Sequence, residues 1–163
     1  MDFEIYEPTA FSGKWFSHKS NGPAVRYEIA ISIVGGDICW TNGPFPAGKY
    51  PDITIFRRGL MKKLDPGEFV EADHGYDGEM GKIRLPYETD NKGEISRKGR
   101  ARARHEGMNA FIKNFKALSD TWCHPVEGGQ HKVAFDAAVT ITQIGIDLGK
   151  IKPFKCQAPY KKK

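Results

Sequence analysis

The sequence predicts a single α/β domain in which helices pack on a mixed sheet. One segment alternates apolar and polar residues as a strand does, and later segments repeat apolar residues at helical spacing. The length of 163 residues suits one domain, and the 39% of hydrophobic residues can form a packed core. We expect residues 1–150 to form this domain and residues 151–163 to form a basic C-terminal tail.

The first elements read as strands. Residues 2–6 predict a short strand, and residues 26–33 predict a half-buried one, because every second residue from Tyr27 to Ile33 is apolar. Gly35-Gly36 supplies the positive φ of a two-residue hairpin turn. A return strand over 37–41 and then a loop over 42–51 follow.

Helices dominate the second half of the chain. A helix begins at Pro51-Asp52, repeats apolar residues as far as Leu64, and ends at Asp65-Pro66-Gly67. Short strands are expected over 68–73 and 82–87, so the first helix joins strands as a crossover does.

A polar loop over 89–93 and a basic run over 97–104 come next, and the last two helices are expected after them. The first of these helices carries an apolar stripe, and the final helix covers 130–148 with Gly149 as its C-cap. The stripe of the earlier helix consists of Met108, Phe111, Ile112, Phe115 and Leu118.

Composition excludes several classes of protein. No apolar run approaches the length that spans a bilayer, so we expect no membrane association. Cys39, Cys123 and Cys156 are too few and too widely spaced for a disulfide framework and suit a reducing compartment. The net charge of +5 favours an anionic partner.

Two acidic residues are the strongest candidates for catalysis. Asp73 ends a short strand before a turn, where ligands gather in α/β sheets and where a carboxylate can hold a hard cation. A turn-forming Asp is the alternative. Glu106 lies on a helix face with Asn109 and Lys113, away from the apolar stripe. A surface Glu that stabilises the helix dipole is its alternative.

A cluster of cations precedes Glu106. These five residues could follow a phosphate backbone, or they could form a solvated helix face or a nuclear-import signal. They are Arg97, Lys98, Arg100, Arg102 and Arg104. Cys123, His124 and His131 are soft ligands, but their spacing matches no zinc pattern, so we expect structural roles for them.

Several segments together resemble the catalytic domain of DDE superfamily endonucleases, the transposases of the PIF/Harbinger and IS5 type. The similarity covers about residues 2–148, and the order and spacing of its motifs are more specific than any one of them. The matching segments are Lys14–Lys19, Arg26–Ile29, Asn42–Gly48, Pro51–Arg57, Glu71–Tyr76 and Arg102–Glu106 with Asn109 and Lys113.

The resemblance implies an RNase H-like fold and phosphodiester cleavage and strand transfer on DNA with two Mg²⁺ or Mn²⁺ ions. Asp73 and Glu106 match the second and third metal-binding acids of the family. Asp52 matches a family Asp at the start of a helix, which either caps that helix or supports the metal ligands, and Asn109 is expected to support them. The basic run with Lys113 is then expected to contact DNA. The resemblance also allows a separate DNA-binding partner protein and an oligomer. We expect a nuclear location in a eukaryote and a cytoplasmic one otherwise.

The sequence departs from the family at its first residues. The family's first catalytic Asp belongs to an Asp-Gly-x-Asp-Phe motif, of which Met1-Asp2-Phe3 matches only the end, so that Asp would fall just before Met1. Asp2 cannot replace it, because a three-residue offset on a strand turns the side chain to the opposite face. We therefore expect a fragment or degenerate copy with little or no activity. The alternative is a non-catalytic, transposon-derived domain that binds nucleic acid or protein.

Overall fold

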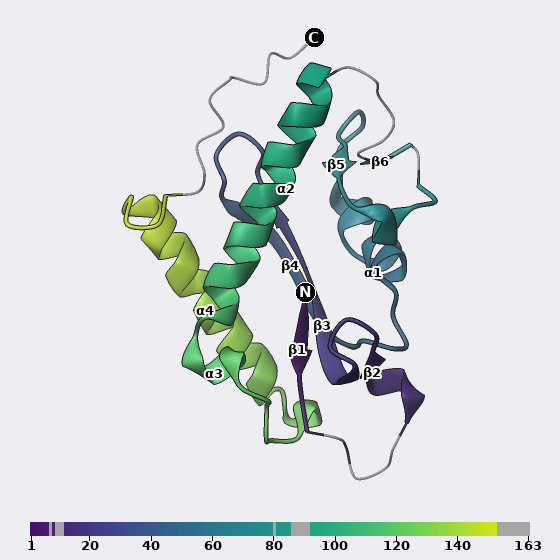
Figure 1. The fold of residues 1–163 in the computed structure, drawn as a ribbon, viewed down its shortest axis with the longest axis vertical. Coiled ribbons are helices and arrows are strands. Elements are labelled where there is room, and N and C mark those ends of the chain that lie inside the picture. Colours follow the sequence, from purple (N-terminus) through teal and green to yellow (C-terminus); the bar gives the residue numbers. More distant parts are fainter. Residues whose placement is uncertain (7, 9–11, 80, 86–91, 153–163) are drawn as a thin grey trace.

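The computed structural model describes residues 1–6, 8, 12–79, 81–85 and 92–152, and Figure 1 shows how they are arranged. Helices and strands both contribute extensively, so the molecule has the α/β class that the sequence predicts. Within the described ranges, no helix has the length and apolar character needed to cross a membrane. The expected tail falls almost entirely outside these ranges, as does Cys156.

The main sheet is built around β3 (Gly22–Ile31). This strand pairs antiparallel with β1 (Asp2–Glu4), β2 (Phe16–Ser17) and β4 (Ile38–Pro46). Arg26 lies opposite Asp2 of β1 and also opposite Phe45 of β4, so β3 is flanked on both edges.

The β3–β4 hairpin is longer than the sequence predicts. β4 continues to Pro46, although residues 42–51 were expected to form a loop, because its backbone pairs with β3 despite the Gly43-Pro44 interruption. Proline is tolerated in a strand when its nitrogen faces away from the ladder. The Ser32 N–H donates to the Asp37 carbonyl oxygen, so the turn spans residues 33–36 and not two residues.

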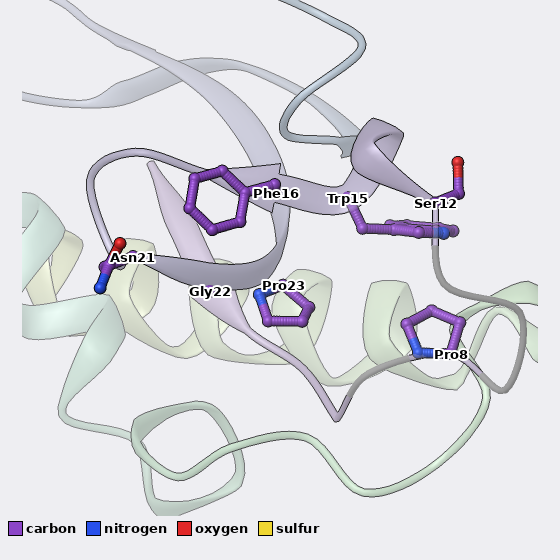
Figure 2. A pocket seen from close by; sticks show the side chains of 7 residues that line it. All are labelled: Pro8, Ser12, Trp15, Phe16, Asn21, Gly22 and Pro23. Carbon is purple, nitrogen blue, oxygen red and sulfur yellow. The ribbon is translucent and has the colours of Figure 1, made fainter.

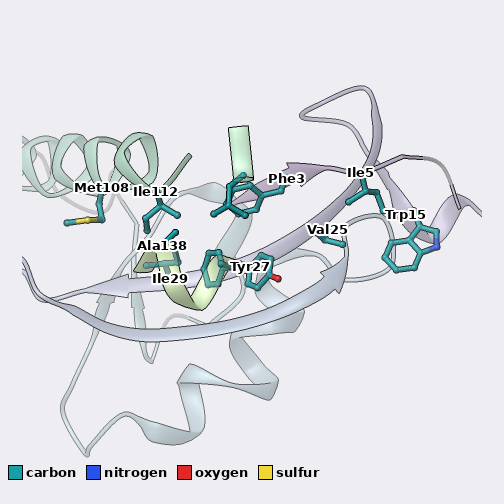
Figure 3. Close-up of a cluster of buried hydrophobic side chains, with 11 residues drawn as sticks. Phe3, Ile5, Trp15, Val25, Tyr27, Ile29, Met108, Ile112 and Ala138 are labelled. Carbon is teal, nitrogen blue, oxygen red and sulfur yellow. The ribbon is translucent and has the colours of Figure 1, made fainter. Parts of the chain in front are cut away.

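Three helices cover one face of this sheet. They are α2 (Lys92–Lys113), α3 (Lys116–Ser119) and α4 (Gln130–Asp147), and Figure 1 shows α2 and α4 crossing the strands. The buried residues between these helices and the sheet form the larger core, drawn in Figure 3. They are Phe3, Ile5, Trp15, Val25, Tyr27, Ile29, Met108, Ile112, Leu118, Phe135 and Ala138.

A second layer covers the opposite face. It contains α1 (Asp52–Arg58), a 3₁₀ turn at Leu60–Lys63, and a small parallel sheet of β5 (Val70–Glu71) and β6 (Ile83–Arg84). Its core is Phe56, Leu60 and Ile83, against which Ala30 and Trp40 pack from the sheet. β5 therefore pairs with β6 and not with β1, which differs from the single mixed sheet that we expected.

The second layer explains why β3 is buried on both faces. The sequence predicts a half-buried strand, yet Arg26 is 8% exposed and Glu28 is 3% exposed. Their side chains point away from the larger core and lie under the second layer. Alternation of polar and apolar residues distinguishes the two faces of a strand but does not show whether the polar face is covered.

The helices also differ from expectation in their bounds. α1 ends at Arg58 and a 3₁₀ turn continues the chain, while α2 begins at Lys92 and includes the whole basic run. The predicted apolar stripe of α2 is buried at Met108 and Ile112, but Phe111 is 44% exposed. Gly149 has a φ of +65°, as a C-cap after α4 requires. The expected elements over 82–87 and 89–93 lie partly outside the described residues.

Candidate functional site

Asp73 is an exposed residue at the start of a short turn. It follows β5, and its Oδ1 accepts a hydrogen bond of 3.0 Å from the Gly75 N–H, which begins the 3₁₀ turn His74–Tyr76. The turn-forming role that the sequence left open is therefore present. An exposed carboxylate with one remaining oxygen can still bind a cation.

Gly75 holds the Asp73 turn against the start of α1. A Cβ atom on Gly75 would lie 3.0 Å from Asp52 Oδ2 and 3.1 Å from Asp73 Oδ1. Both contacts are closer than ordinary van der Waals contact, so any larger residue would displace one of the two carboxylates. The absence of a side chain at Gly75 thus brings Asp52 and Asp73 together.

Asp52 supports this arrangement through ion pairs. Its carboxylate lies 3.4 Å from Arg26 Nε and 3.3 Å from Lys19 Nζ. Pro51 is the N-cap of α1, and Asp52 is the acidic residue of its first turn. The structure therefore shows Asp52 in ion pairs at the start of this helix.

Asp2 is committed to a buried ion pair. Its carboxylate accepts hydrogen bonds from Arg26 Nε at 2.7 Å, Arg26 Nη2 at 2.8 Å and Ser17 Oγ at 2.6 Å. Burial alone would raise the pKa of Asp2, but the hydrogen bonds from Arg26 and Ser17 outweigh it and lower the pKa to about 2. Asp2 lies on the face of β1 opposite Phe3, and these hydrogen bonds engage both of its carboxylate oxygens.

Glu106 lies on the opposite layer, on the exposed side of α2. Its side chain is 71% exposed and pairs with Arg102 one turn earlier, at 3.9 Å. Such a pair contributes little to stability, so the carboxylate can exchange this partner for another. The dipole-stabilising alternative fails, because Glu106 lies far from the N-terminus of a helix that begins at Lys92.

His105 connects α2 to the central strand of the sheet. Its Nε2 lies 3.1 Å from the Ile29 carbonyl oxygen of β3, and its Nδ1 lies 3.3 Å from Asn109 Nδ2. A carbonyl oxygen only accepts, so Nε2 carries the proton and Nδ1 accepts from Asn109. The buried Oδ1 of Asn109 has no hydrogen-bond partner among the described residues.

The charges around His105 come from three separate parts of the chain. Burial lowers the pKa of His105 and outweighs the opposing effect of its hydrogen bond to the Ile29 carbonyl oxygen. The Met1 amino group lowers this pKa further, whereas the carboxylates of Asp73 and Glu106 raise it. Asp73, Glu106 and the start of β1 therefore act on one side chain, although no group of three metal-binding side chains forms within the described residues.

The cations of the basic run have different environments. Arg104 is buried and donates to the carbonyl oxygens of Ser32 and Ile33, so it holds the β3–β4 turn and does not face a ligand. Lys98 donates to the Leu85 carbonyl oxygen at 2.6 Å and is largely buried. These two residues depart from the DNA contacts that we expected.

The other cations of the run lie at the surface. Arg97, Arg100 and Arg102 are exposed on α2, and so is Lys113, whose Nζ lies 5.7 Å from the centre of the Phe3 ring. Because residues at i, i+4 and i+11 share a helix face, Arg102 and Lys113 flank Glu106.

The three soft residues near the end of the chain do not form a zinc site. Cys123 and His124 are exposed, whereas His131 is buried with its Nδ1 2.9 Å from the Tyr27 hydroxyl. His131 also stacks on Tyr27 and contacts Phe3. Its role is therefore structural, as its spacing from Cys123 predicts.

Two surface cavities lie near the start of the chain. One of about 200 Å³ is shown in Figure 2, and rings of Pro8, Trp15, Phe16 and Pro23 surround it without an ionisable group. The other, of about 330 Å³, includes Lys19, Arg26 and Asp52 in its lining and so adjoins the turn that carries Asp73. Only the second offers charged groups to a ligand.

Sequence reasoning did not find the roles of Arg26 and His105. Arg26 is the one cation within a run of apolar and acidic strand residues, a signal of a buried ion pair. Nothing in the sequence links His105 to Ile29, because the 76 residues between them are brought together only by the fold.

Comparison with known proteins finds no match. No family model, no curated protein and no solved structure is similar to this chain at a significant level.

Proposed function

We propose that this chain is a DDE-type domain, built on an RNase H-like fold, that acts on DNA phosphodiester bonds with Mg²⁺ or Mn²⁺. Asp73 and Glu106 are two of its metal-binding acids. The observation that carries the proposal is that both carboxylates are exposed and that exposed cations flank Glu106, as contact with metal ions and a phosphate backbone requires. When bound, the metal ions supply Lewis-acid activation of the attacking and leaving oxygens.

The antiparallel strands and their two covering layers support the proposed fold. β1, β3 and β4 form consecutive antiparallel neighbours, α2 crosses one face, and the segment that carries Asp73 lies on the other layer. Hard carboxylate oxygens suit Mg²⁺, but two exposed acids hold a dication weakly. The chain as given should therefore bind metal weakly and cut DNA little or not at all.

DNA would approach along the exposed side of α2. Arg102 and Lys113 share the face of Glu106, and Arg97 and Arg100 extend the positive charge toward the start of the helix. Arginine and lysine side chains in this arrangement can contact successive phosphates while leaving Glu106 beside the backbone.

A non-catalytic DNA-binding domain is the second candidate. It is favoured by the lack of any group of three metal-binding side chains within the described residues. The exposed cations of α2 require no third acid to bind phosphate.

The backbone of β1 suggests a rescue experiment. The Met1 amino group donates to the Tyr27 carbonyl oxygen at 2.7 Å, and the Tyr27 N–H donates to the Met1 carbonyl oxygen at 2.8 Å. Residues added before Met1 can continue this ladder. The residue two positions before Met1 would lie opposite Ile29, whose carbonyl oxygen contacts His105. An Asp-Gly pair added there would restore the family motif on the same face of β1 as Phe3.

The experiment compares the chain with and without this Asp-Gly extension in a plasmid-nicking assay with Mg²⁺ or Mn²⁺. We expect nicking only by the extended chain, and its loss in Asp73→Ala and in Glu106→Gln. Asp120→Ala, which removes an exposed acid on another helix end, is the matched control and should leave nicking unchanged.

Two outcomes count against the proposal. Strong nicking by the unextended chain would show that two acids suffice or that other residues bind the metal. An extended chain that neither nicks nor binds Mn²⁺, but binds DNA, would support the non-catalytic candidate.

A further inference from the structure

Helix α4 is apolar on two opposite faces. Its inner face buries His131, Phe135, Ala138 and Thr142 against the sheet and α2. A second stripe, here called the outer stripe, consists of Val133, Ala137, Ile141, Ile144 and Leu148, all exposed. At 100° per residue the two stripes point about 130° apart.

The outer stripe is more apolar than a solvent-facing helix surface should be. Val133 is 69% exposed, Ile141 55%, Ile144 51% and Leu148 68%. Single exposed apolar residues are common, but these follow one another at successive turns. A helix that is hydrophobic on both sides is typical of one that is covered on both sides.

We propose that the outer stripe binds the outer stripe of a second copy of this chain, with the two α4 helices antiparallel. The spacing of its members is four, four, three and four residues, nearly the same in both directions. Val133 then meets Leu148 of the second copy, and Ala137 meets Ile144 of the second copy. Ile141 lies close to the two-fold axis. Small residues opposite large ones allow the two helices to interdigitate.

The charges beside the stripe fit a second copy. Lys132 and Asp136 form an ion pair near the start of α4, and Asp147 and Lys150 lie near its end. An antiparallel pair brings the first two of one copy beside the last two of the other. Each end then holds two cations and two carboxylates. This balance favours a second copy over a strongly acidic or strongly basic partner, which would find no net opposite charge here.

The length of the contact predicts its strength. From Val133 to Leu148 the helix rises about 22 Å, so one helix pair forms the whole contact. This is smaller than a standard protein interface, and we expect a dissociation constant in the micromolar range.

Sedimentation velocity at low to high micromolar concentration tests the proposal. The chain should convert from monomer to dimer as concentration rises, and Ile141→Asp/Ile144→Asp should weaken the dimer by roughly tenfold or more. Val34→Asp is the matched control, because Val34 is 76% exposed and does not belong to the outer stripe. Circular dichroism should show that both variants fold.

Disulfide cross-linking tests the antiparallel register. In a background with Cys39, Cys123 and Cys156 replaced by Ser, Ala137→Cys/Ile144→Cys should oxidise to a covalent dimer, and Ala137→Cys alone should not. A chain that stays monomeric at every concentration overturns the proposal. So does a dimer that survives Ile141→Asp/Ile144→Asp, since it must use another surface. Cross-linking of Ala137→Cys alone would overturn the antiparallel arrangement.

Discussion

Single residues in this protein derive their properties from burial more than from residue type. Arg26 and His131 illustrate this. Arg26 lies on the polar face of a strand, yet it is 8% exposed and forms an ion pair with Asp2. Histidine is a polar residue type that is often exposed. His131, however, is 1% exposed and packs among aromatic rings. The chemistry of each residue follows from the groups that surround it.

His131 should make stability depend on pH. Burial lowers its pKa from 6.5 to about 4, so the unfolded chain binds more protons between these values than the folded one. Stability that is fully present above pH 6.5 should therefore fall by about 3 kcal/mol as the pH drops toward 4. Urea unfolding at a series of pH values measures this. His131→Gln should remove this contribution and leave that of His105, whose pKa burial also lowers, whereas His124→Gln, which changes an exposed histidine, should leave both.

A pH profile of His131→Gln that matches the unchanged chain would contradict this assignment. The low pKa of Asp2 predicts a separate loss at more acidic pH, as the pH falls through about 2, and His131→Gln should leave that loss in place.

At the scale of elements, α2 carries two kinds of cation on one helix. Arg104 faces inward and donates to carbonyl oxygens of the β3–β4 turn, whereas Arg102, two residues earlier, faces solvent beside Glu106. Their closeness in sequence suggests one common role. However, each residue of a helix turns the side chain by about 100°, so side chains two positions apart point to nearly opposite sides.

This difference predicts opposite effects of two similar substitutions. Arg102→Ala should weaken DNA binding without changing stability. The slope of the logarithm of the binding constant against the logarithm of the salt concentration should become less steep by about one. Arg104→Ala leaves buried carbonyl oxygens without a donor and should lower the free energy of unfolding by about 1–3 kcal/mol. Fluorescence anisotropy at several salt concentrations and urea unfolding measure the two effects. Equal loss of DNA binding in folded Arg102→Ala and Arg104→Ala would contradict this division.

The whole molecule is a sheet covered on both faces, and β3 belongs to both cores. Val25, Tyr27 and Ile29 face α2 and α4, while Ala30 packs against the layer of α1. Neither layer can separate without exposing the central strand, so the two cores should unfold together.

Truncations in the two cores test this coupling. Phe135→Ala and Phe56→Ala, on opposite faces, should each lower the free energy of unfolding by about 3–5 kcal/mol. Each should retain a single transition, with coincident midpoints by far-ultraviolet circular dichroism and by tryptophan fluorescence. Two separated transitions in either variant would show that the layers are independent units.

The sequence by itself determined the order of the main elements and the apolar face of each strand. Alternation from Tyr27 onward located β3, and helical spacing located α4 and most of α2, since local periodicity follows from backbone geometry. The end of the hairpin and the start of α2 were misplaced. Backbone pairing extends β4 through Gly43-Pro44, and α2 continues through the run of cations. Apolar spacing predicts neither of these, because neither depends on it.

Only the tertiary structure decided how the candidate residues relate to one another. Asp73 and Glu106 were found from sequence as separate positions. In the structure they lie on layers that cover opposite faces of the sheet, and the contact of His105 with Ile29, 76 positions apart, holds the helix that carries Glu106 against β3. The same holds for the ion pair of Arg26 with Asp2 and for the second apolar face of α4. Local spacing shows which side chains share a face, but burial and charge at that face depend on what the rest of the chain places over it.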